Sequence, residues 1–268
     1  MRHLRWAVLL AVPLSAFGQG KAAKPVPTVE VVRPVGSVGV NWEGQVLRAT
    51  GAGAPDLKAA NPGQARLGAE RSAKQDASKN LLEQVRTLQL SAGRSVGDEM
   101  VRSEVRERVE TAVRGHKVVA KRFFSDSGVE LDVEVPLAAI TSALVVPAPG
   151  ATIVFNSAGA KKYTGLVVDA RGLGLKPVLA PRLLDAAGKA LYGAGALASE
   201  VRESTGVAAW FNSLDAAKKA ALVGEKPMVV KATGLKGSDL VLASDDVKTL
   251  GEVNTGFLAE GRVVIVTQ

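Results

Sequence analysis

The clearest pattern in the sequence is a helical one between residues 61 and 90. Small and apolar residues recur there at spacings of three and four, which places them on one face of a helix. They are Ala65, Ala69, Ala73, Ala77, Leu81, Val85 and Leu88. Asn61 is a favourable N-cap, and Pro62 suits the first helical position. Because the first half of this face is alanine, we expect its partner surface to approach closely.

Shorter patterns flank this long helix. Val38, Val40 and Trp42 share one face of a strand predicted over 38–50, which the glycine-rich residues 51–55 are expected to break. A second helix is predicted over 98–114, with Gly115 as its stop. Its expected apolar stripe is Val101, Val105, Val109 and Ala112.

A β-hairpin is predicted next, with strands at 118–124 and 129–135 around a turn at 125–128, where Gly128 can take a positive φ. The second strand alternates apolar residues with acids, as a half-buried strand does. The acids are Glu130, Asp132 and Glu134. We interpret them as the solvated face of a sheet. The alternative is a hydrolase that uses two of these carboxylates.

Pro147–Gly150 marks a predicted domain boundary, since glycines become more frequent and apolar runs shorter beyond it. Strands are expected there at 166–168, 178–184, 189–192, 227–232 and 262–267, with a hairpin turn at 185–188 and short helices at 214–222 and from Ser244. The predicted fold class is therefore α+β. An N-terminal strand, long helix, second helix and β-hairpin form a domain over 37–146, and a smaller mixed α/β domain follows over 147–268.

The first residues have the order of a cleavable signal peptide. Arg2 and Arg5 precede an apolar run at 6–14, and small residues then allow a cut after Gly18. The alternative is a retained anchor or a buried N-terminal helix. Residues 19–36 are rich in Lys, Pro and Val and are expected to be an extended tether. We therefore expect a periplasmic or secreted protein, with no transmembrane helix after signal cleavage.

Composition narrows the classes of function. The formal charge is +8, or +6 without Arg2 and Arg5, but the basic residues lie among acids. A nucleic-acid partner is not expected, because it calls for a basic stripe. Peptidoglycan or another anionic surface suits an exported basic protein better. The chain has no cysteine, which excludes disulfides, thiolate catalysis and lipid attachment through an N-terminal cysteine.

The sequence offers little catalytic chemistry. His116 is the one histidine outside the predicted signal peptide, and it falls at an expected turn with nothing near it that resembles an oriented base. We predict no catalytic residue, no metal site and no cofactor. The candidate binding residues are Asp169 and Arg171, which project from one face at a strand end, together with Tyr163. Their alternative is a structural ion pair.

The few large aromatic residues are candidates for an interface. Trp42, Trp210 and Phe211 could contact another protein, because aromatic residues are enriched at binding hot spots. The alternative is that they fill the core.

Residues 61–77, NPGQARLGAERSAKQDA, followed by the two-stranded 118–135 region, resemble the LPP-twenty envelope lipoprotein family. The N-terminal domain of the flagellar assembly protein T is similar. The stretches YTGLVVDARG at 163–172 and RVVIV at 262–266 look like the C-terminal half of longer members, so the resemblance covers 38–268. It implies an exported, non-enzymatic envelope protein, and the lipobox cysteine of the family is missing here.

Together these patterns predict a non-enzymatic cell-envelope protein with a structural or assembly role. Its expected partners are other envelope proteins, and the resemblance adds a link to flagella. The alternative is a periplasmic module that binds a small ligand or a glycan through Asp169 and Arg171.

Overall fold

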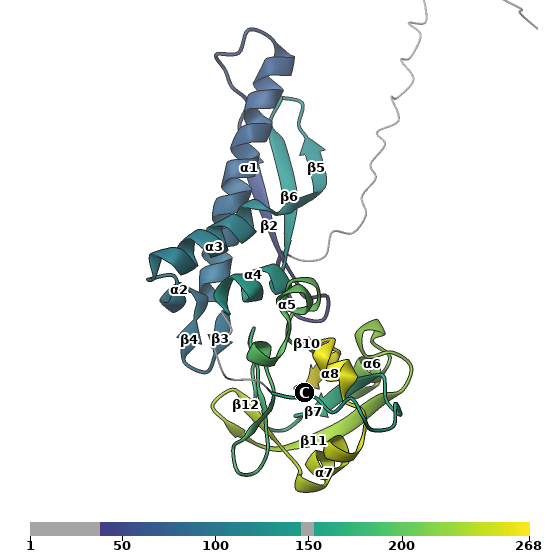
Figure 1. Cartoon of the computed structure of the whole chain (residues 1–268). Coiled ribbons are helices and arrows are strands. Elements are labelled where there is room, and N and C mark those ends of the chain that lie inside the picture. The colour runs from purple at the N-terminus through teal and green to yellow at the C-terminus, as the bar shows by residue number, and fades with distance from the viewer. Residues whose placement is uncertain (1–37, 146–152) are drawn as a thin grey trace, which may run out of the picture. The chain divides into compact units, whose positions relative to one another are not determined.

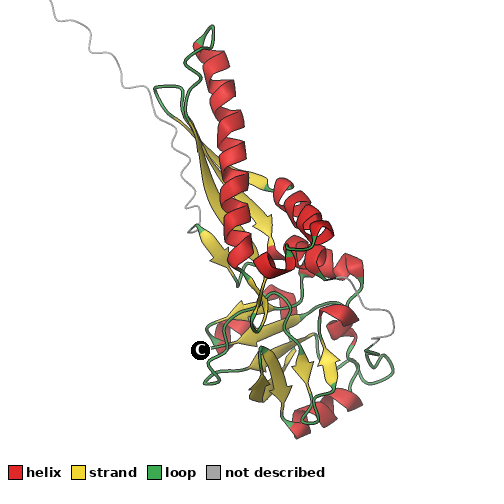
Figure 2. Ribbon diagram, turned by 90° about the vertical axis from the view of Figure 1, so that its left-hand side faces the viewer, coloured by secondary structure: helices red, strands yellow, loops and turns green. Residues whose placement is uncertain are grey.

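The computed structural model describes residues 38–145 and 153–268, which form a four-stranded sheet, a seven-stranded sheet and a two-stranded ribbon with helices around them (Figures 1 and 2). The α+β class predicted from the sequence is confirmed. The predicted signal peptide at 1–18, the tether at 19–36 and the boundary at 147–150 lie outside the described residues.

The four-stranded sheet has the order β1-β2-β6-β5, and all of its pairs are antiparallel. Its strands are β1 (Gly39–Asn41), β2 (Val46–Gly53), β5 (Lys117–Phe123) and β6 (Val129–Pro136). The strand predicted over 38–50 is thus two strands around a turn. The predicted break at 51–55 is wrong, because β2 continues to Gly53. In the hairpin turn the positive φ falls on Ser127 instead of Gly128.

The helix α1 (Pro62–Thr87) lies along one face of this sheet (Figure 2). Asn61 caps it, since its Oδ1 accepts a hydrogen bond from the Gln64 amide at 2.9 Å. A Cβ added at Gly51 would lie 2.2 Å from the Ala77 nitrogen. The backbones of helix and strand are therefore in contact, and the expected close approach is confirmed. The glycines are in the strand because no side chain fits there.

The helix predicted over 98–114 is two helices, α2 (Val96–Glu99) and α3 (Ser103–Arg114). The separate start of α2 has a local cause. Ser95 and Asp98 form a reciprocal capping box, which begins a helix before residue 98. Val101 lies in the connection and is 77% exposed, so it is not part of the apolar stripe. Gly115 ends α3 as predicted.

Two further elements belong to residues 38–145, and both lie near the hollow described below. The ribbon joins β3 (Gln89–Ser91) to β4 (Arg94–Ser95), and the sequence did not predict it. The helix α4 (Leu137–Leu144) follows β6 directly and was also missed.

The seven-stranded sheet has the order β10-β13-β7-β11-β12-β8-β9. It is mixed, because the first four strands are parallel and β11 pairs antiparallel with β12. The strands are β7 (Gly165–Asp169), β8 (Leu183–Leu184), β9 (Ala190–Tyr192), β10 (Ala209–Phe211), β11 (Pro227–Lys236), β12 (Asp239–Leu242) and β13 (Val263–Val266). The interior position predicted for the last strand is confirmed, since all four residues of β13 are buried.

Short helices connect these strands. They are η1 (Ala194–Ala196), α5 (Ser199–Thr205), α6 (Leu214–Lys218), η2 (Ala221–Val223), α7 (Ser244–Glu252) and α8 (Gly256–Ala259). Ser213 caps α6 as expected, because its hydroxyl accepts a bond from the Ala216 amide. The predicted cap at Ser244 is wrong, because this residue already lies inside α7 and makes no cap bond.

Backbone hydrogen bonds join the segment before β8 to the ribbon. The Leu179 amide donates to the Gln89 carbonyl at 2.9 Å, and the Ala180 amide donates to the Leu90 carbonyl at 3.0 Å. All described residues belong to one compact unit of the chain. These bonds fix the two sides of the hollow that forms the candidate site.

Candidate functional site

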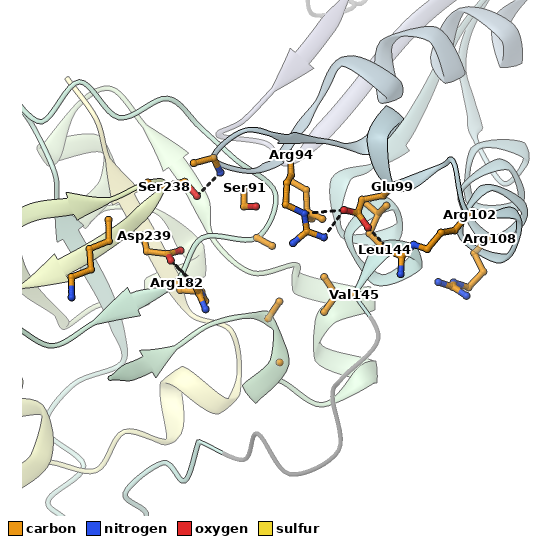
Figure 3. A pocket seen from close by; sticks show the side chains of 17 residues that line it. Ser91, Arg94, Glu99, Arg102, Arg108, Leu144, Val145, Arg182, Ser238 and Asp239 are labelled. Carbon is orange, nitrogen blue, oxygen red and sulfur yellow. Dashed lines mark hydrogen bonds and ion pairs between the residues drawn. The ribbon is translucent and has the colours of Figure 1, made fainter. Parts of the chain in front are cut away.

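A hollow of about 620 Å³ opens beside the ribbon (Figure 3). We call it the cationic hollow, because its lining carries five basic side chains and two carboxylates. The basic residues are Arg94, Arg102, Arg108, Arg182 and Lys236, and the acids are Glu99 and Asp239. The volume falls in the range of small-molecule sites, which is roughly 300–1,000 Å³.

On one side of the cationic hollow, a buried carboxylate holds two guanidinium groups. Glu99 accepts a hydrogen bond from Arg94 Nε at 2.9 Å and further bonds from the terminal nitrogens of Arg94 and Arg102. The Glu99 side chain is largely buried, whereas both arginines are more than half exposed. The capping box that starts α2 sets the position of Glu99 at the end of this short helix.

Arg108 lies on the same side and comes from α3 (Figure 3). Its Nε donates to the Ala143 carbonyl at 2.8 Å, so α4 orients this guanidinium. Three arginines and one carboxylate therefore share this wall, which leaves an excess of positive charge there.

The other side of the hollow comes from the seven-stranded sheet. Arg182 donates from Nε to Asp239 Oδ2 at 3.0 Å and makes a second bond to the same oxygen from a terminal nitrogen. Hydrogen bonding to Asp239 raises the pKa of Arg182 above its ordinary value. Lys236 lies opposite Asp239 in the antiparallel backbone register of β11 and β12. Gly237 has a φ of 67° in this turn, as the first central residue of a two-residue hairpin often has.

A hydrogen bond links the two sides of the hollow, and apolar residues line part of it. The Ala92 amide donates to Ser238 Oγ at 2.9 Å, which joins the ribbon to the β11–β12 turn. Apolar residues also line the hollow, and they are Leu90, Ala92, Leu144, Val145, Ala180 and Ala194. Guanidinium groups bind planar anions through two parallel hydrogen bonds. The cationic hollow therefore has the chemistry to bind an anion with an apolar part.

The predicted binding residues are placed differently. Asp169 and Arg171 do meet, with Arg171 Nε and Nη2 at 2.8 and 2.7 Å from the two carboxylate oxygens. This bond to Arg171 lowers the pKa of Asp169. Tyr163 precedes β7 whereas Asp169 ends it, so about 13 Å of strand separates them at roughly 3.3 Å per residue. The structure thus forms the ion pair and does not bring Tyr163 to it.

The three aromatic interface candidates differ in their exposure to solvent. Trp210 is 2% exposed, and its Nε1 donates to the Val178 carbonyl at 3.1 Å. It is a core residue, so its prediction as an interface residue is wrong. Trp42 and Phe211 are half-buried, and Trp42 packs against both large core clusters.

The acidic strand is neutralised within the sheet. Both carboxylate oxygens of Asp132 accept bonds from Arg122, at 2.6 and 2.7 Å, and Asp132 also accepts from Thr50 at 2.7 Å. Glu134 pairs with Arg48 at 2.7 Å. The fully solvated face predicted for these acids is therefore wrong at Asp132, which is buried. The arrangement is a row of ion pairs rather than two opposed carboxylates.

His116 lies at the end of α3, where its Nδ1 is 3.0 Å from the Val113 carbonyl and donates to it. In the part of the chain that the structure describes, no group of three potential metal ligands gathers. Nor does any helix within 38–145 or 153–268 combine the length and apolar character needed to span a bilayer.

Sequence reasoning missed the residues of the cationic hollow. Arg94 and Glu99 lie in a predicted loop and helix start, and Arg182 and Asp239 lie more than fifty residues apart in the chain. One local signal was present, because Gly237-Ser238 between two apolar runs is a hairpin turn. That signal could have placed Lys236 opposite Asp239, but it could not have placed either residue near Arg94, Arg102 and Arg108.

Comparison with known families finds a match over less than half of the chain. Residues 165–268 are similar to the second domain of Treponema pallidum Tp0624. No curated protein matches the chain. The matched residues include the whole of the seven-stranded sheet, and the matched range contributes Arg182, Lys236 and Asp239 to the cationic hollow.

Proposed function

We propose that this chain is an exported, non-enzymatic binding protein of the cell envelope, and that an anionic ligand occupies its cationic hollow. The proposal rests on the excess of positive charge that lines this concave site. Five cations and two carboxylates line it, and each carboxylate is largely buried against an arginine. The guanidinium groups are thus held at the surface of the hollow, where an incoming anion can reach them.

The pKa values of two carboxylates outside the hollow support a binding role over a hydrolytic one. A glycosidase of the usual kind needs one carboxyl group with a raised pKa to act as the acid. The pKa of Asp132 is instead lowered, chiefly by its hydrogen bonds to Arg122. Asp169 is in the same situation beside Arg171. Both groups are suited to structural pairing.

The cell-envelope location rests on the sequence of residues 1–18. The charged, apolar and small-residue order there is that of an export signal. Mass spectrometry of the native protein tests it directly. A mature N-terminus after Gly18 supports the proposal, and an intact N-terminus on protein recovered from the cytosol contradicts it.

Anion binding is tested by titration calorimetry of the mature chain with glutarate, hexanoate and inorganic phosphate. We expect at least one of them to bind, and the double variant Arg102→Gln, Arg108→Gln to weaken that binding at least tenfold. Arg171→Gln is the control for loss of a guanidinium outside the hollow, and the single variants Arg102→Gln and Arg108→Gln match it in the charge that they remove. If no anion binds, or if the hollow variants behave like Arg171→Gln, the proposal is wrong.

An assembly role is a second candidate, and exposed apolar side chains favour it. Phe123 and Phe124 are 54% and 49% exposed at the end of β5. The Arg66 guanidinium lies 5.3 Å from the centre of the Phe123 ring, so a cation accompanies this apolar patch. An apolar patch with a cationic edge suits an acidic protein surface of the envelope. The family resemblance would make flagellar basal structures one setting for such a partner.

The assembly role is tested by cross-linking in isolated envelopes. The double variant Phe123→Ser, Phe124→Ser should lose the cross-linked species that the unchanged chain forms. Val229→Ser is the matched control, since Val229 is similarly exposed but lies on β11. Equal cross-linking in the two variants contradicts this role.

A further inference from the structure

We infer that the anionic group bound in the cationic hollow is a doubly charged phosphate monoester group. This inference rests on the proposed function and adds the chemical class of the ligand to it. It starts from one side of the hollow, where three arginines accompany a single carboxylate. In Figure 3, Arg94, Arg102 and Arg108 lie on the same side of the hollow as Glu99.

The charge on this side exceeds what its carboxylate can neutralise. Glu99 forms ion pairs with Arg94 and Arg102, whereas the third arginine binds a backbone carbonyl. Three guanidinium groups and one carboxylate leave an excess of two positive charges. On the other side of the hollow, the guanidinium of Arg182 is already neutralised by Asp239. We therefore place the bound anion on the side of Glu99.

The three arginines also keep hydrogen-bond donors that the chain does not use. Glu99 accepts bonds from Nε and Nη2 of Arg94 and from Nη2 of Arg102, and Arg108 donates from Nε to a carbonyl. Within residues 38–145 and 153–268, the Nη1 groups of all three arginines have no hydrogen-bond partner. A phosphate monoester offers three terminal oxygens to such donors, and a carboxylate offers two.

A buried arginine behind the lining adds a further positive charge. Arg202 is 2% exposed, and its guanidinium binds uncharged groups, which are the carbonyls of Ala194 and Leu197 and the hydroxyl of Ser199. Its Nε is buried and has no partner in the described part of the chain. Ala194 itself lines the hollow. A buried charge is costly without an opposite charge nearby, so two negative charges in the hollow offset this cost better than one.

The test compares butyl phosphate with butyl sulfate by titration calorimetry of the mature chain. The two esters share a tetrahedral shape and an alkyl chain. The phosphate carries about 1.5–2 negative charges at pH 7, and the sulfate carries one. We expect butyl phosphate to bind at least tenfold more tightly than butyl sulfate at pH 7.5.

This preference should disappear in mild acid. A phosphate monoester takes up its second proton at about pH 6, so it becomes singly charged at pH 5 while the sulfate is unchanged. The tenfold preference should therefore fall below threefold at pH 5. The charged groups that line the hollow are five basic residues and two carboxylates, and a change of charge on any of them acts on both esters. The sulfate is thus the reference at each pH.

One variant and its control locate the effect. Arg108→Gln leaves Glu99 with its two arginines, and it should reduce the preference at pH 7.5 below threefold. Arg114→Gln is the matched control, because it removes the same charge from an exposed arginine of α3 that does not line the hollow. An equal reduction in both variants would trace the preference to net charge and overturn the inference.

A phosphate monoester group occurs in soluble esters and in the headgroup of phosphatidic acid. Co-sedimentation with phosphatidic acid vesicles, reversed by added butyl phosphate, assigns a lipid headgroup. Binding of butyl phosphate without co-sedimentation assigns a soluble ester. Both results support the inference.

The outcomes separate the two proposals. If the two esters bind equally at pH 7.5 and Arg108→Gln weakens both, the doubly charged group is wrong and the anion site stands. If neither ester binds, and glutarate and hexanoate do not bind either, both proposals are overturned.

Discussion

Gly53 lies against the backbone of Ala69, where a Cβ on Gly53 would come within 1.9 Å of the Ala69 carbonyl oxygen. Gly51 has the same relationship with Ala77 farther along α1. Both contacts join a strand backbone directly to a helix backbone. They explain why alanines form the first half of the buried face of α1 and why larger residues follow only after Ala77.

This contact predicts that Gly53→Ala destabilises the fold. The added methyl group has no space, so α1 must move away from β2, and overpacking of this kind costs about 1–3 kcal/mol. Gly234→Ala is the matched control, because Gly234 also lies in a strand and a Cβ there meets nothing within 4 Å. Urea unfolding of both variants measures the difference. Equal free energies of unfolding would show that α1 and β2 are not in backbone contact.

The pair of Asp132 and Arg122 predicts a dependence of stability on pH. Hydrogen bonds from Arg122 lower the pKa of Asp132, so the ionised carboxylate stabilises the folded state above the ordinary pKa of about 3.9. This contribution is lost as the pH falls through the lowered pKa. Asp132→Asn should therefore lower the free energy of unfolding by about 1–2 kcal/mol at pH 7. This value takes into account that solvent screens the partly exposed guanidinium of Arg122.

The measurement is the free energy of unfolding of both proteins between pH 7 and pH 2. The difference between them should shrink below about pH 4 as the carboxyl of the unchanged protein takes up a proton. Glu83→Gln, which removes an exposed carboxylate 4.0 Å from Lys79, should change little at any pH. A difference that stays constant down to pH 2 contradicts the assignment.

The sequence predicted elements whose periodicity is local and missed those that depend on distant neighbours. The cap at Asn61 and the alanine spacing were enough for α1, and alternation was enough for β6. Gly51 looked like a strand end because the helix that requires a glycine there follows in the chain. The helix α4 was missed because its buried residues face three different neighbours, α5, α3 and β6, and no simple stripe results.

The site was predicted less well than the fold. Asp169 and Arg171 are two residues apart, so their pairing was visible in the sequence. The cationic hollow is lined by residues between positions 90 and 239, and no local sequence pattern predicts that residues so far apart lie together. The burial of Trp210 had a similar cause, since the carbonyl that accepts its Nε1 hydrogen belongs to Val178.

The buried position of Trp210 predicts a large effect on stability. Trp210→Ala should cost about 3–5 kcal/mol, as truncation of a buried aromatic residue does. Trp210→Phe keeps most of the volume but leaves the Val178 carbonyl without its donor, which costs about 1–3 kcal/mol. Phe123→Ala, at an exposed position, is the control and should change stability little. The reverse order, with Phe123→Ala the more destabilising, would place Trp210 at a surface.

The ion pair of Asp169 and Arg171 predicts a small effect, because Arg171 is exposed and the two residues are close in the chain. The double variant Asp169→Ala, Arg171→Ala should unfold at nearly the same temperature as the unchanged protein. It should also bind glutarate with the same affinity, since neither residue lines the cationic hollow. Calorimetry of the variant measures both quantities. A loss of binding with an unchanged thermal midpoint would instead place the ligand site at the end of β7. That outcome would support the alternative from the sequence, in which Asp169 and Arg171 bind the ligand.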